Sequence, residues 1–286
     1  MSNYGVNDSS ESAGAFTGTE RKAVNLIDLK SRRASGDRIV MLTCYDASFT
    51  RMLDDCGVDV LLIGDSLGMV LQGHSSTLPV TMDQMAYHTE CVARAKPKAW
   101  ILADMPFGSY QGSPAQAYAN AARLIAAGAQ MVKIEGGGWL APTVEFLTQR
   151  GISVCAHLGL TPQSVHQLGG YRVQGRDQPA ADQLIADAKL LEVSGADMVL
   201  VELIPTPVGA RLTESLSVPT IGIGAGPHMT GQVLVLHDIL DVTPGKKARF
   251  AKNYMRGAGS IREAVSRYVQ EVKSGAYPGP EHGFES

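Results

Sequence analysis

From Arg38 onward the chain repeats one unit: a short apolar run, a polar or glycine-rich stop, and a segment with helical periodicity. This alternation is typical of βα units arranged around a parallel sheet. We expect eight strands, at residues 38–46, 58–66, 99–107, 131–137, 152–160, 197–205, 219–226 and, with the weakest pattern, 233–240. Helices are predicted at 83–95, 113–128, 142–151 and 181–195, and several of these segments end at a glycine suited to a C-cap.

Eight such units within about 250 residues match the usual size of a TIM (β/α)8 barrel. We therefore predict this α/β fold rather than an open doubly wound sheet. An extra helix at residues 24–33 should precede the first strand and close the bottom of the barrel. Residues 1–22 are rich in serine and glycine and are predicted to form a flexible arm, which leaves residues 23–286 as a single barrel domain.

Composition narrows the classes of partner. The 286 residues are 44% hydrophobic and 19% charged, with a formal net charge of −3. The basic residues are scattered and no apolar stretch could span a bilayer, so neither nucleic acid nor a membrane is expected as a partner. A small molecule is the better expectation. The four cysteines lack CxxC spacing, which favours reduced thiols and a cytoplasmic location.

Polar side chains gather where the predicted strands end, and in a barrel these ends form the active-site face. They are Tyr45, Asp46, Asp65, Ser66, Asp104, Lys133, Glu135, His157 and Glu202. Lys133 and Glu135 are two residues apart on one strand, so both should point into the mouth of the barrel.

The charge of this group indicates a metal. Asp65, Asp104, Glu135 and Glu202 contribute −4 and Lys133 returns +1, which leaves −3. Clustered carboxylates repel one another or take up protons unless a cation joins them. Oxygen ligands without a histidine or cysteine set suit a hard ion, so we predict Mg²⁺.

Each candidate also has a structural interpretation. Asp46, and less readily Asp65 and Asp104, could cap a helix, and Lys133 with Glu135 could form a structural ion pair. His157 could be an orienting or core histidine as well as a catalytic one. Glu202 lies between apolar neighbours and is the candidate general base. The remaining histidines considered, His74, His88, His166, His228 and His237, are expected to be structural.

Two further segments leave alternatives open. The glycines of TIGIGAG, Gly222, Gly224 and Gly226, could form a phosphate nest or allow close packing. Residues 161–178 lack periodicity and are rich in glycine and polar residues, which predicts a mobile lid or substrate clamp.

Seven strings make the sequence resemble the ketopantoate hydroxymethyltransferase family from about residue 24 to about residue 250. They are GDSLGMV (64–70), DMPFGSY (104–110), VKIEGG (132–137), AHLGLTPQ (156–163), GGYRVQGR (169–176), VELIP (201–205) and IGIGAG (221–226). Two features depart from the family pattern. Thr230 precedes Gly-Gln-Val-Leu where an aspartate is usual, which puts the contact of that acid in doubt, and the serine- and glycine-rich N-terminal arm lies outside the family core with no role assigned.

The resemblance implies a Mg²⁺-dependent TIM barrel of the phosphoenolpyruvate/pyruvate superfamily. Such an enzyme moves a one-carbon unit from 5,10-methylenetetrahydrofolate to 3-methyl-2-oxobutanoate through a Mg-stabilised enolate, and gives 2-dehydropantoate for pantothenate and coenzyme A. It also implies a homodecamer.

The same resemblance assigns roles to residues. Asp65 and Asp104 would ligate the metal and thereby the substrate, and Glu135 would do so directly or through water. Ser66 and Lys133 would hold the keto acid, and Glu202 would accept the proton. Two rival hypotheses remain. Another Mg-dependent 2-oxo acid lyase or mutase would resemble a pattern with a Lys-Cys-Gly-His string, which this sequence lacks. A non-enzymatic metabolite-binding barrel would leave the carboxylates idle.

Overall fold

The computed structural model describes residues 21–245 and 247–285. Eight parallel strands form a closed barrel in chain order, with β8 beside β1. The strands are β1 (Ile39–Thr43), β2 (Val60–Ile63), β3 (Trp100–Asp104), β4 (Met131–Glu135), β5 (Val154–Gly159), β6 (Met198–Glu202), β7 (Thr220–Ile223) and β8 (Gly231–Leu234). The predicted fold is confirmed.

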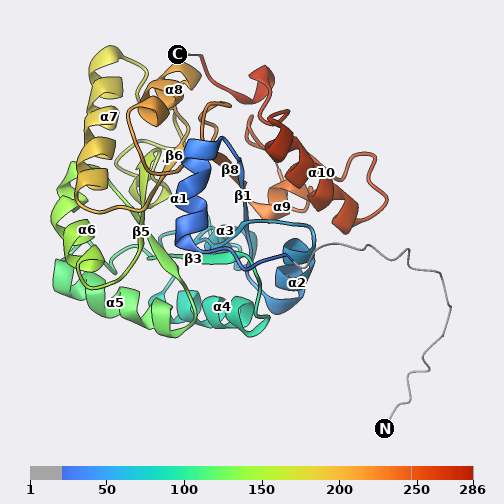
Figure 1. The fold of residues 1–286 in the computed structure, drawn as a ribbon, viewed down its shortest axis with the longest axis horizontal. Helices are drawn as coiled ribbons and strands as arrows, with labels where there is room; N and C mark the ends of the chain where they lie inside the picture. Colours follow the sequence, from blue (N-terminus) through green and yellow to red (C-terminus); the bar gives the residue numbers. More distant parts are fainter. Residues whose placement is uncertain (1–20, 246, 286) are drawn as a thin grey trace, which may run out of the picture.

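Helices form a ring outside the strands, and α10 lies beside β1 and α2 (Figure 1). They are α1 (Leu26–Ser35), α2 (Ala47–Asp55), α3 (Leu67–Val70), α4 (Met82–Arg94), α5 (Pro114–Ala126), α6 (Ala141–Thr148), α7 (Gln178–Val193), α8 (Thr206–Glu214), α9 (Leu236–Ile239) and α10 (Ile261–Ser274). Short 3₁₀ turns occur at Gly138–Leu140, Pro162–Ser164 and Pro280–His282. Because helices cover their outer face, the strands are buried almost throughout and their sequences are nearly continuously apolar.

The eighth strand differs from its prediction. It spans Gly231–Leu234, whereas Leu236–Ile239, predicted as strand, form helix α9. A Cβ atom on Gly231 would lie 2.4 Å from the carbonyl oxygen of Ile39, so the pairing of β8 with β1 requires a glycine there. The hydroxyl of Thr43 then accepts a hydrogen bond from the Leu236 amide (2.9 Å), where the chain has already left the sheet.

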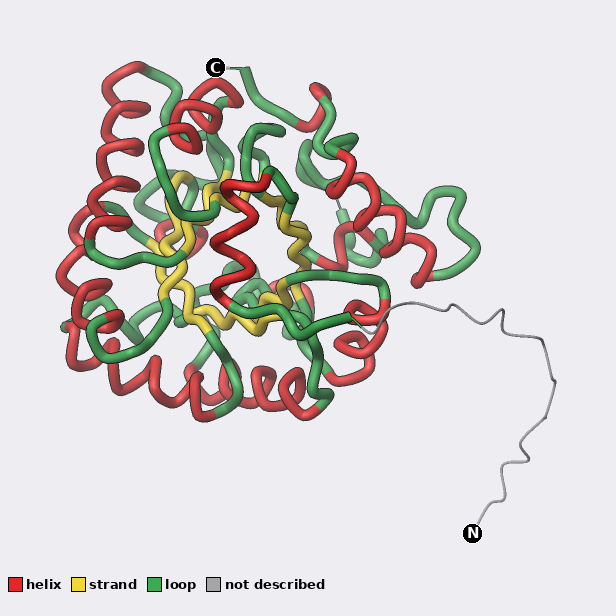
Figure 2. Tube along the Cα trace, in the orientation of Figure 1, coloured by secondary structure: helices red, strands yellow, loops and turns green. Residues whose placement is uncertain are grey.

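Helix α1 closes the N-terminal end of the barrel, as predicted. It crosses the ring of strands in Figures 1 and 2. Leu29 is fully buried, Lys30 pairs with Asp197 (2.6 Å), and Arg33 donates to the carbonyl of Thr213 (2.8 Å). Because Asp197 and Thr213 precede β6 and β7, these contacts fix α1 over the strand beginnings.

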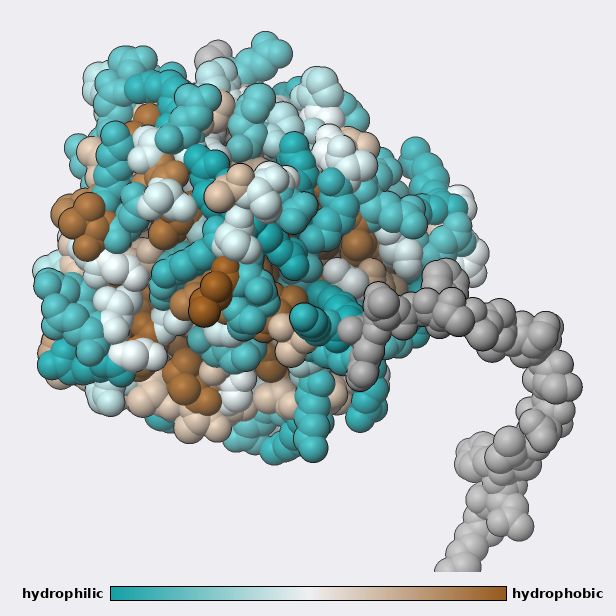
Figure 3. Space-filling view, viewed as in Figure 1, coloured by the Kyte–Doolittle hydropathy of each residue, from teal (hydrophilic) through white to brown (hydrophobic). Residues whose placement is uncertain are grey.

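The outer surface on this side is mostly hydrophilic with separate hydrophobic patches (Figure 3). In the part of the chain that the structure describes, no helix combines the length and apolarity needed to cross a bilayer. The four cysteines are free, and Cys44 and Cys155 are buried. The predicted arm falls outside the described residues except for its last two, of which Arg21 donates to the carbonyls of Asp54 (3.0 Å) and Val58 (2.6 Å).

Candidate active site

A cavity of about 850 Å³ opens at the C-terminal end of the barrel. Most of the predicted site residues line it: Asp65, Ser66, Asp104, Lys133, Glu135, His157 and Glu202. His74, which was expected to be structural, also lies in its wall. The structure therefore brings together side chains from β3, β4, β5 and β6 and from the loop after β2.

Strand register explains this convergence. In neighbouring strands Asp104 pairs with Lys133, Glu135 pairs with His157, and Gly159 pairs with Glu202. Gly159 has a φ of +86°, and a Cβ atom there would lie 2.2 Å from the Glu202 carbonyl oxygen. Only glycine lets β5 and β6 approach closely enough at this point to set Glu202 beside the cavity.

The aspartates meet at the end of β2. The amide of Asp65 donates to Asp104 Oδ2 (3.0 Å), so a backbone hydrogen bond joins the two residues. A Cβ atom on Gly64 would lie 2.7 Å from Ser66 Oγ and 3.6 Å from Asp104 Oδ2. The glycine therefore makes room for the polar groups that follow it.

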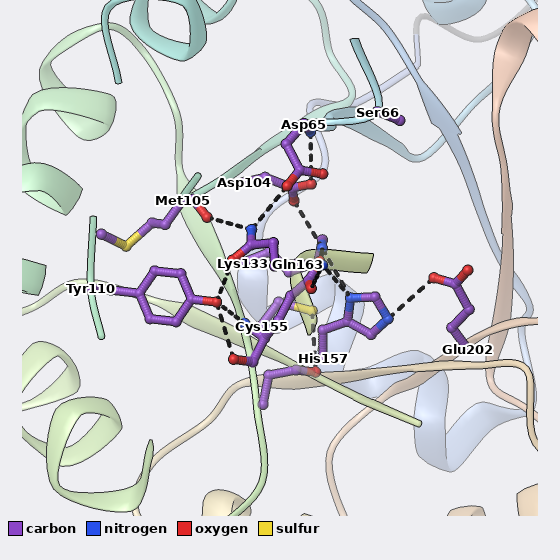
Figure 4. Close-up of polar contacts among 12 residues, drawn as sticks. Asp65, Ser66, Asp104, Met105, Tyr110, Lys133, Cys155, His157, Gln163 and Glu202 are labelled. Atoms are coloured by element: carbon purple, nitrogen blue, oxygen red, sulfur yellow. Dashed lines mark hydrogen bonds and ion pairs between the residues drawn. The ribbon is translucent and has the colours of Figure 1, made fainter. Parts of the chain in front are cut away.

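Lys133 is the cation at the centre of the group (Figure 4). Its Nζ lies 3.2 Å from Asp104 Oδ1, 3.5 Å from Glu135 Oε1 and 3.1 Å from His157 Nδ1. Burial alone would lower the pKa of Lys133, but Asp104, Glu135 and Asp65 outweigh it and raise that pKa. The ammonium is charged.

The three carboxylates differ in how they are compensated. Burial, and then the charges of Asp104 and Glu135, raise the pKa of Asp65 well above its usual value. Burial also raises the pKa of Asp104, against the opposing effect of Lys133. Burial acts in the same direction on Glu135, but Lys133 and His157 prevail and lower its pKa to about 2. Lys133 therefore satisfies Glu135 and leaves Asp65 in need of positive charge.

His157 connects Glu135 to Glu202. Its Nδ1 lies 3.3 Å from Glu135 Oε1 and its Nε2 lies 3.3 Å from Glu202 Oε2. Burial and Lys133 lower the pKa of His157, but Glu135 and Glu202 outweigh them and raise it. The Glu202 side chain is 13% exposed and lines the cavity. This geometry supports the orienting role considered for His157.

Two residues of this network were not predicted. Gln163 is 5% exposed: its backbone amide donates to Glu135 Oε2 (2.9 Å), and its side-chain amide donates to Asp65 Oδ2 (2.9 Å) and to the Met105 carbonyl (2.9 Å). Tyr110 donates to Gln163 Oε1 (2.7 Å) and accepts from the Glu135 amide (3.0 Å). Gln163 and Tyr110 each end one of the strings on which the family resemblance rests. That resemblance is the feature of the sequence from which they could have been predicted.

The segment predicted to be a lid or clamp provides Gln163 near its start and Tyr171 farther along. The Tyr171 hydroxyl contacts Met69 Sδ of α3 (3.4 Å), and Tyr171 lines the cavity. The first turn of the segment, Pro162–Ser164, is thus held inside the site. The position of this segment against the cavity is consistent with a substrate clamp. That the segment moves stays a prediction.

Other candidates have structural roles. Asp46 caps α2 by accepting hydrogen bonds from the amides of Ser48 (2.7 Å) and Phe49 (2.9 Å). The Tyr45 hydroxyl lies 2.9 Å from Ser66 Oγ and supports it from behind the cavity wall. Thr230 lies at the opposite end of the barrel, where its hydroxyl accepts from the Thr220 amide (3.2 Å).

Close packing accounts for the TIGIGAG glycines. Added Cβ atoms on Gly222, Gly224 and Gly226 would lie 2.6 Å from Met229, 2.8 Å from Phe250 and 2.6 Å from Thr206. The packing alternative, rather than a phosphate nest, fits these contacts.

The donor set fits a hard cation held by two carboxylates. Within residues 21–245 and 247–285, no three His, Cys, Asp or Glu side chains are gathered into a ready-made metal site. Among the described residues, the buried Oδ1 atom of Asp104 has only the 3.2 Å ion pair with Lys133, which also serves Glu135, and the pKa of Asp65 is raised by burial and negative neighbours. Mg²⁺ needs only one or two protein carboxylates, because waters and substrate oxygens complete its coordination.

Comparisons with known proteins show the family of the chain. A family model described as ketopantoate hydroxymethyltransferase matches residues 23–280. A protein of Azoarcus sp. strain BH72 named 3-methyl-2-oxobutanoate hydroxymethyltransferase is 62% identical over 264 residues, which cover 92% of this chain and 97% of that relative. A Burkholderia lata protein named 3-methyl-2-oxobutanoate hydroxymethyltransferase 2 is 58% identical over 266 residues, 93% of this chain and 98% of the relative.

Solved structures share the fold at low identity. Phosphonopyruvate hydrolase in complex with oxalate and Mg²⁺ gives a TM-score of 0.57 at 13% identity, covering 91% of this chain and 93% of that one. 2,3-Dimethylmalate lyase, a member of the PEP mutase/isocitrate lyase superfamily, gives 0.54 at 16% identity, covering 73% and 80%. These structures support the barrel alone. From the family model and the two relatives, we conclude that the chain belongs to the ketopantoate hydroxymethyltransferase family.

Proposed function

We propose that the protein transfers the methylene carbon of 5,10-methylenetetrahydrofolate to C3 of 3-methyl-2-oxobutanoate and so forms 2-dehydropantoate. The observation that carries this proposal is the arrangement of the cavity: Asp65 and Asp104 lie under-compensated on one wall, and Glu202 faces the same space from β6. The cavity therefore offers a binding site for a cation and an oxo acid, with a general base beside it.

Asp65 and Asp104 are the residues that would hold Mg²⁺, and Glu135 would act on it from farther away. When bound, the ion would supply positive charge to the keto oxygen while C3 loses its proton. The oxygen-only donor set supports this assignment, as does Asp104 Oδ1, whose positive neighbour is a Lys133 ammonium shared with Glu135.

Lys133 and Ser66 would bind the keto acid. The buried Lys133 ammonium offers a positive charge to the substrate oxygens from the floor of the barrel. The Ser66 hydroxyl, fixed by Tyr45 at 2.9 Å, supplies a neutral hydrogen bond. Because one group is charged and the other neutral, the Lys133 ammonium and the Ser66 hydroxyl would together fix the orientation of a small keto acid.

Glu202 would remove the C3 proton. A positioned carboxylate typically accelerates such a step by about 10²- to 10⁴-fold. His157 contacts Glu202 at 3.3 Å and links it to Glu135, which limits the directions in which the carboxylate points. Leu203, directly after Glu202, has a φ of +43°, an uncommon conformation that turns the chain away after the base.

One carbon–nitrogen bond of the donor breaks first, and that nitrogen takes a proton, which leaves the methylene carbon as an iminium. The C3–H bond breaks, its proton goes to Glu202, and C3 bonds to the iminium carbon. One water then replaces the second carbon–nitrogen bond: its hydroxyl stays on the transferred carbon and its other hydrogen goes to the second nitrogen, while the proton on Glu202 makes up for the one taken by the first nitrogen. The products are 2-dehydropantoate and tetrahydrofolate, which would serve pantothenate synthesis. A cytoplasmic homodecamer remains the expectation from the family resemblance.

The direct test supplies 5,10-methylenetetrahydrofolate, 3-methyl-2-oxobutanoate and Mg²⁺ and measures 2-dehydropantoate by mass spectrometry. We expect product only when all three are present, and chelation of the metal should stop its formation. C3 proton exchange without one-carbon transfer would instead favour a lyase or mutase of the same fold.

A further inference from the structure

The cavity is larger than the proposed keto acid requires. Its volume of about 850 Å³ is in the range that holds a drug-sized ligand, about 300–1,000 Å³, whereas 3-methyl-2-oxobutanoate is a branched five-carbon acid. Part of its wall comes from α9, from the segment after α9 and from Phe284 near the C-terminus. The lining residues of this part, which we call the outer lobe, are Asp238, Lys247, Arg249, Phe250 and Phe284.

Two aromatic rings place the outer lobe beside the proposed base. Phe250 and Phe284 both approach Gly224, since a Cβ atom there would lie 2.8 Å from one ring and 3.3 Å from the other. Gly224 directly follows Ile223, the register partner of Glu202. A flat ligand against these rings would therefore reach the carbon from which Glu202 takes its proton, and aromatic walls suit such a ligand.

The polar groups of the outer lobe carry opposite charges. Asp238 is half-buried on α9. On the rim, Arg249 Nε donates to the Glu281 carbonyl (2.9 Å), and the guanidinium carbon lies 5.6 Å from the Phe284 ring centre. Its terminal nitrogens make no other hydrogen bond within the described parts of the chain. Lys247 lies 3.5 Å from Asp241 and also donates to the Thr243 carbonyl.

We infer that the outer lobe binds the folate donor, an assignment that rests on the proposed function. Asp238 accepts hydrogen bonds from the amino group and ring N–H of the pterin, which present two donors side by side to a carboxylate. Phe250 and Phe284 flank the ring system. Arg249 and Lys247 bind the carboxylates of the glutamate tail, because a fork of guanidinium donors matches a carboxylate.

The experiment compares two donors, 5,10-methylenetetrahydrofolate and 5,10-methylenetetrahydropteroate, which lacks the glutamate. We expect the wild type to have a kcat/KM at least tenfold higher for the donor with the tail. In Arg249→Ala and Lys247→Ala this ratio should fall toward one. In Asp238→Asn the kcat/KM for each donor should fall at least tenfold, mainly through a higher KM. The ratio of kcat/KM between the two donors should stay as in the wild type.

Arg256→Ala is the matched control, because Arg256 is an exposed arginine on the same segment that does not line the cavity. It should keep the wild-type ratio, and thermal melting should show that every variant is folded. A wild type without donor preference, or an unchanged ratio in both Arg249→Ala and Lys247→Ala, would overturn the inference. A wild type that uses neither donor would overturn the proposed function itself.

Discussion

The two ends of the barrel both bury aspartates, but in opposite electrostatic settings. At the N-terminal end, Asp59 is 3% exposed and lies 2.7 Å from Arg32, 2.6 Å from Lys273 and 3.4 Å from Arg21. At the C-terminal end, Asp65 is equally buried, but it shares the single positive charge of Lys133 with Asp104 and Glu135.

The difference separates structure from function. A buried carboxylate surrounded by cations stabilises the fold as part of an ion network, and removing it leaves these partly exposed cations without their counter-charge. A buried carboxylate beside others of its kind gains nothing for the fold. Such an arrangement indicates a binding site for a positively charged ligand. The same residue type thus performs two roles, and the neighbouring charges decide which.

The largest expected effect is on the base at the C-terminal end. Glu202→Gln keeps the shape of the side chain but removes its ability to accept a proton. We expect C3 proton exchange of 3-methyl-2-oxobutanoate in D₂O with Mg²⁺ to slow by about 10²- to 10⁴-fold. Proton NMR measures this rate without folate.

Binding of Mg²⁺ and keto acid to Glu202→Gln should stay near the wild-type affinity, because Glu202 is proposed to meet only the C3–H group of the keto acid and not to ligate the metal. Proton exchange that persists at the wild-type rate would show that Glu202 is not the base. The C-terminal end of the barrel would then lack the catalytic group that distinguishes it from the N-terminal end.

The next effect compares the same substitution at both ends. Asp59→Asn should lower the free energy of unfolding by about 3 kcal/mol, because Arg32 and Lys273 lose their buried counter-charge. Asp65→Asn should leave the free energy of unfolding of the metal-free protein unchanged or raise it, since it removes repulsion with Asp104 and Glu135. Urea unfolding of both variants without Mg²⁺ provides the measurement. Equal losses in the two variants would show that Asp65 is as structural as Asp59.

The smallest effect concerns the hydrogen bonds that hold the clamp. Tyr110→Phe removes the shorter of two hydrogen bonds to Gln163 Oε1, which keeps only the one from Gln111 (3.3 Å), and takes the Tyr110 hydroxyl from the Glu135 amide, which should cost about 1–3 kcal/mol of stability. Tyr171→Phe is the matched control: that side chain is 48% exposed and its hydroxyl contacts only the Met69 sulfur among the described residues, so we expect less than about 0.5 kcal/mol. Denaturant midpoints that coincide for the two variants would contradict the role given to Tyr110.

Sequence reasoning located the residues on strands better than those on loops. Asp104, Lys133, Glu135 and His157 were predictable because parallel strands bring their C-terminal ends to one rim, where register places side chains in pairs. Gln163 was not, because a single polar residue in an aperiodic segment carries no sign of the partners it meets after folding.

The same limit applies to element boundaries. The start of β8 is Gly231-Gln232, which is not apolar, and its place in the sheet depends on a close approach to Ile39 that no local pattern reveals. Helix α10 was not predicted, although its Tyr268 donates to the carbonyls of Met41 (2.9 Å) and Gln232 (3.1 Å) and so joins the first and last strands.

The most direct test of the central claim, that the under-compensated aspartates bind Mg²⁺ for the keto acid, is isothermal titration with Mg²⁺ in the presence of 3-methyl-2-oxobutanoate. Wild type and Asp46→Ala should bind alike, because Asp46 only caps a helix. Asp65→Ala and Asp104→Ala should each bind at least tenfold more weakly. Unaltered affinity in both would contradict the account.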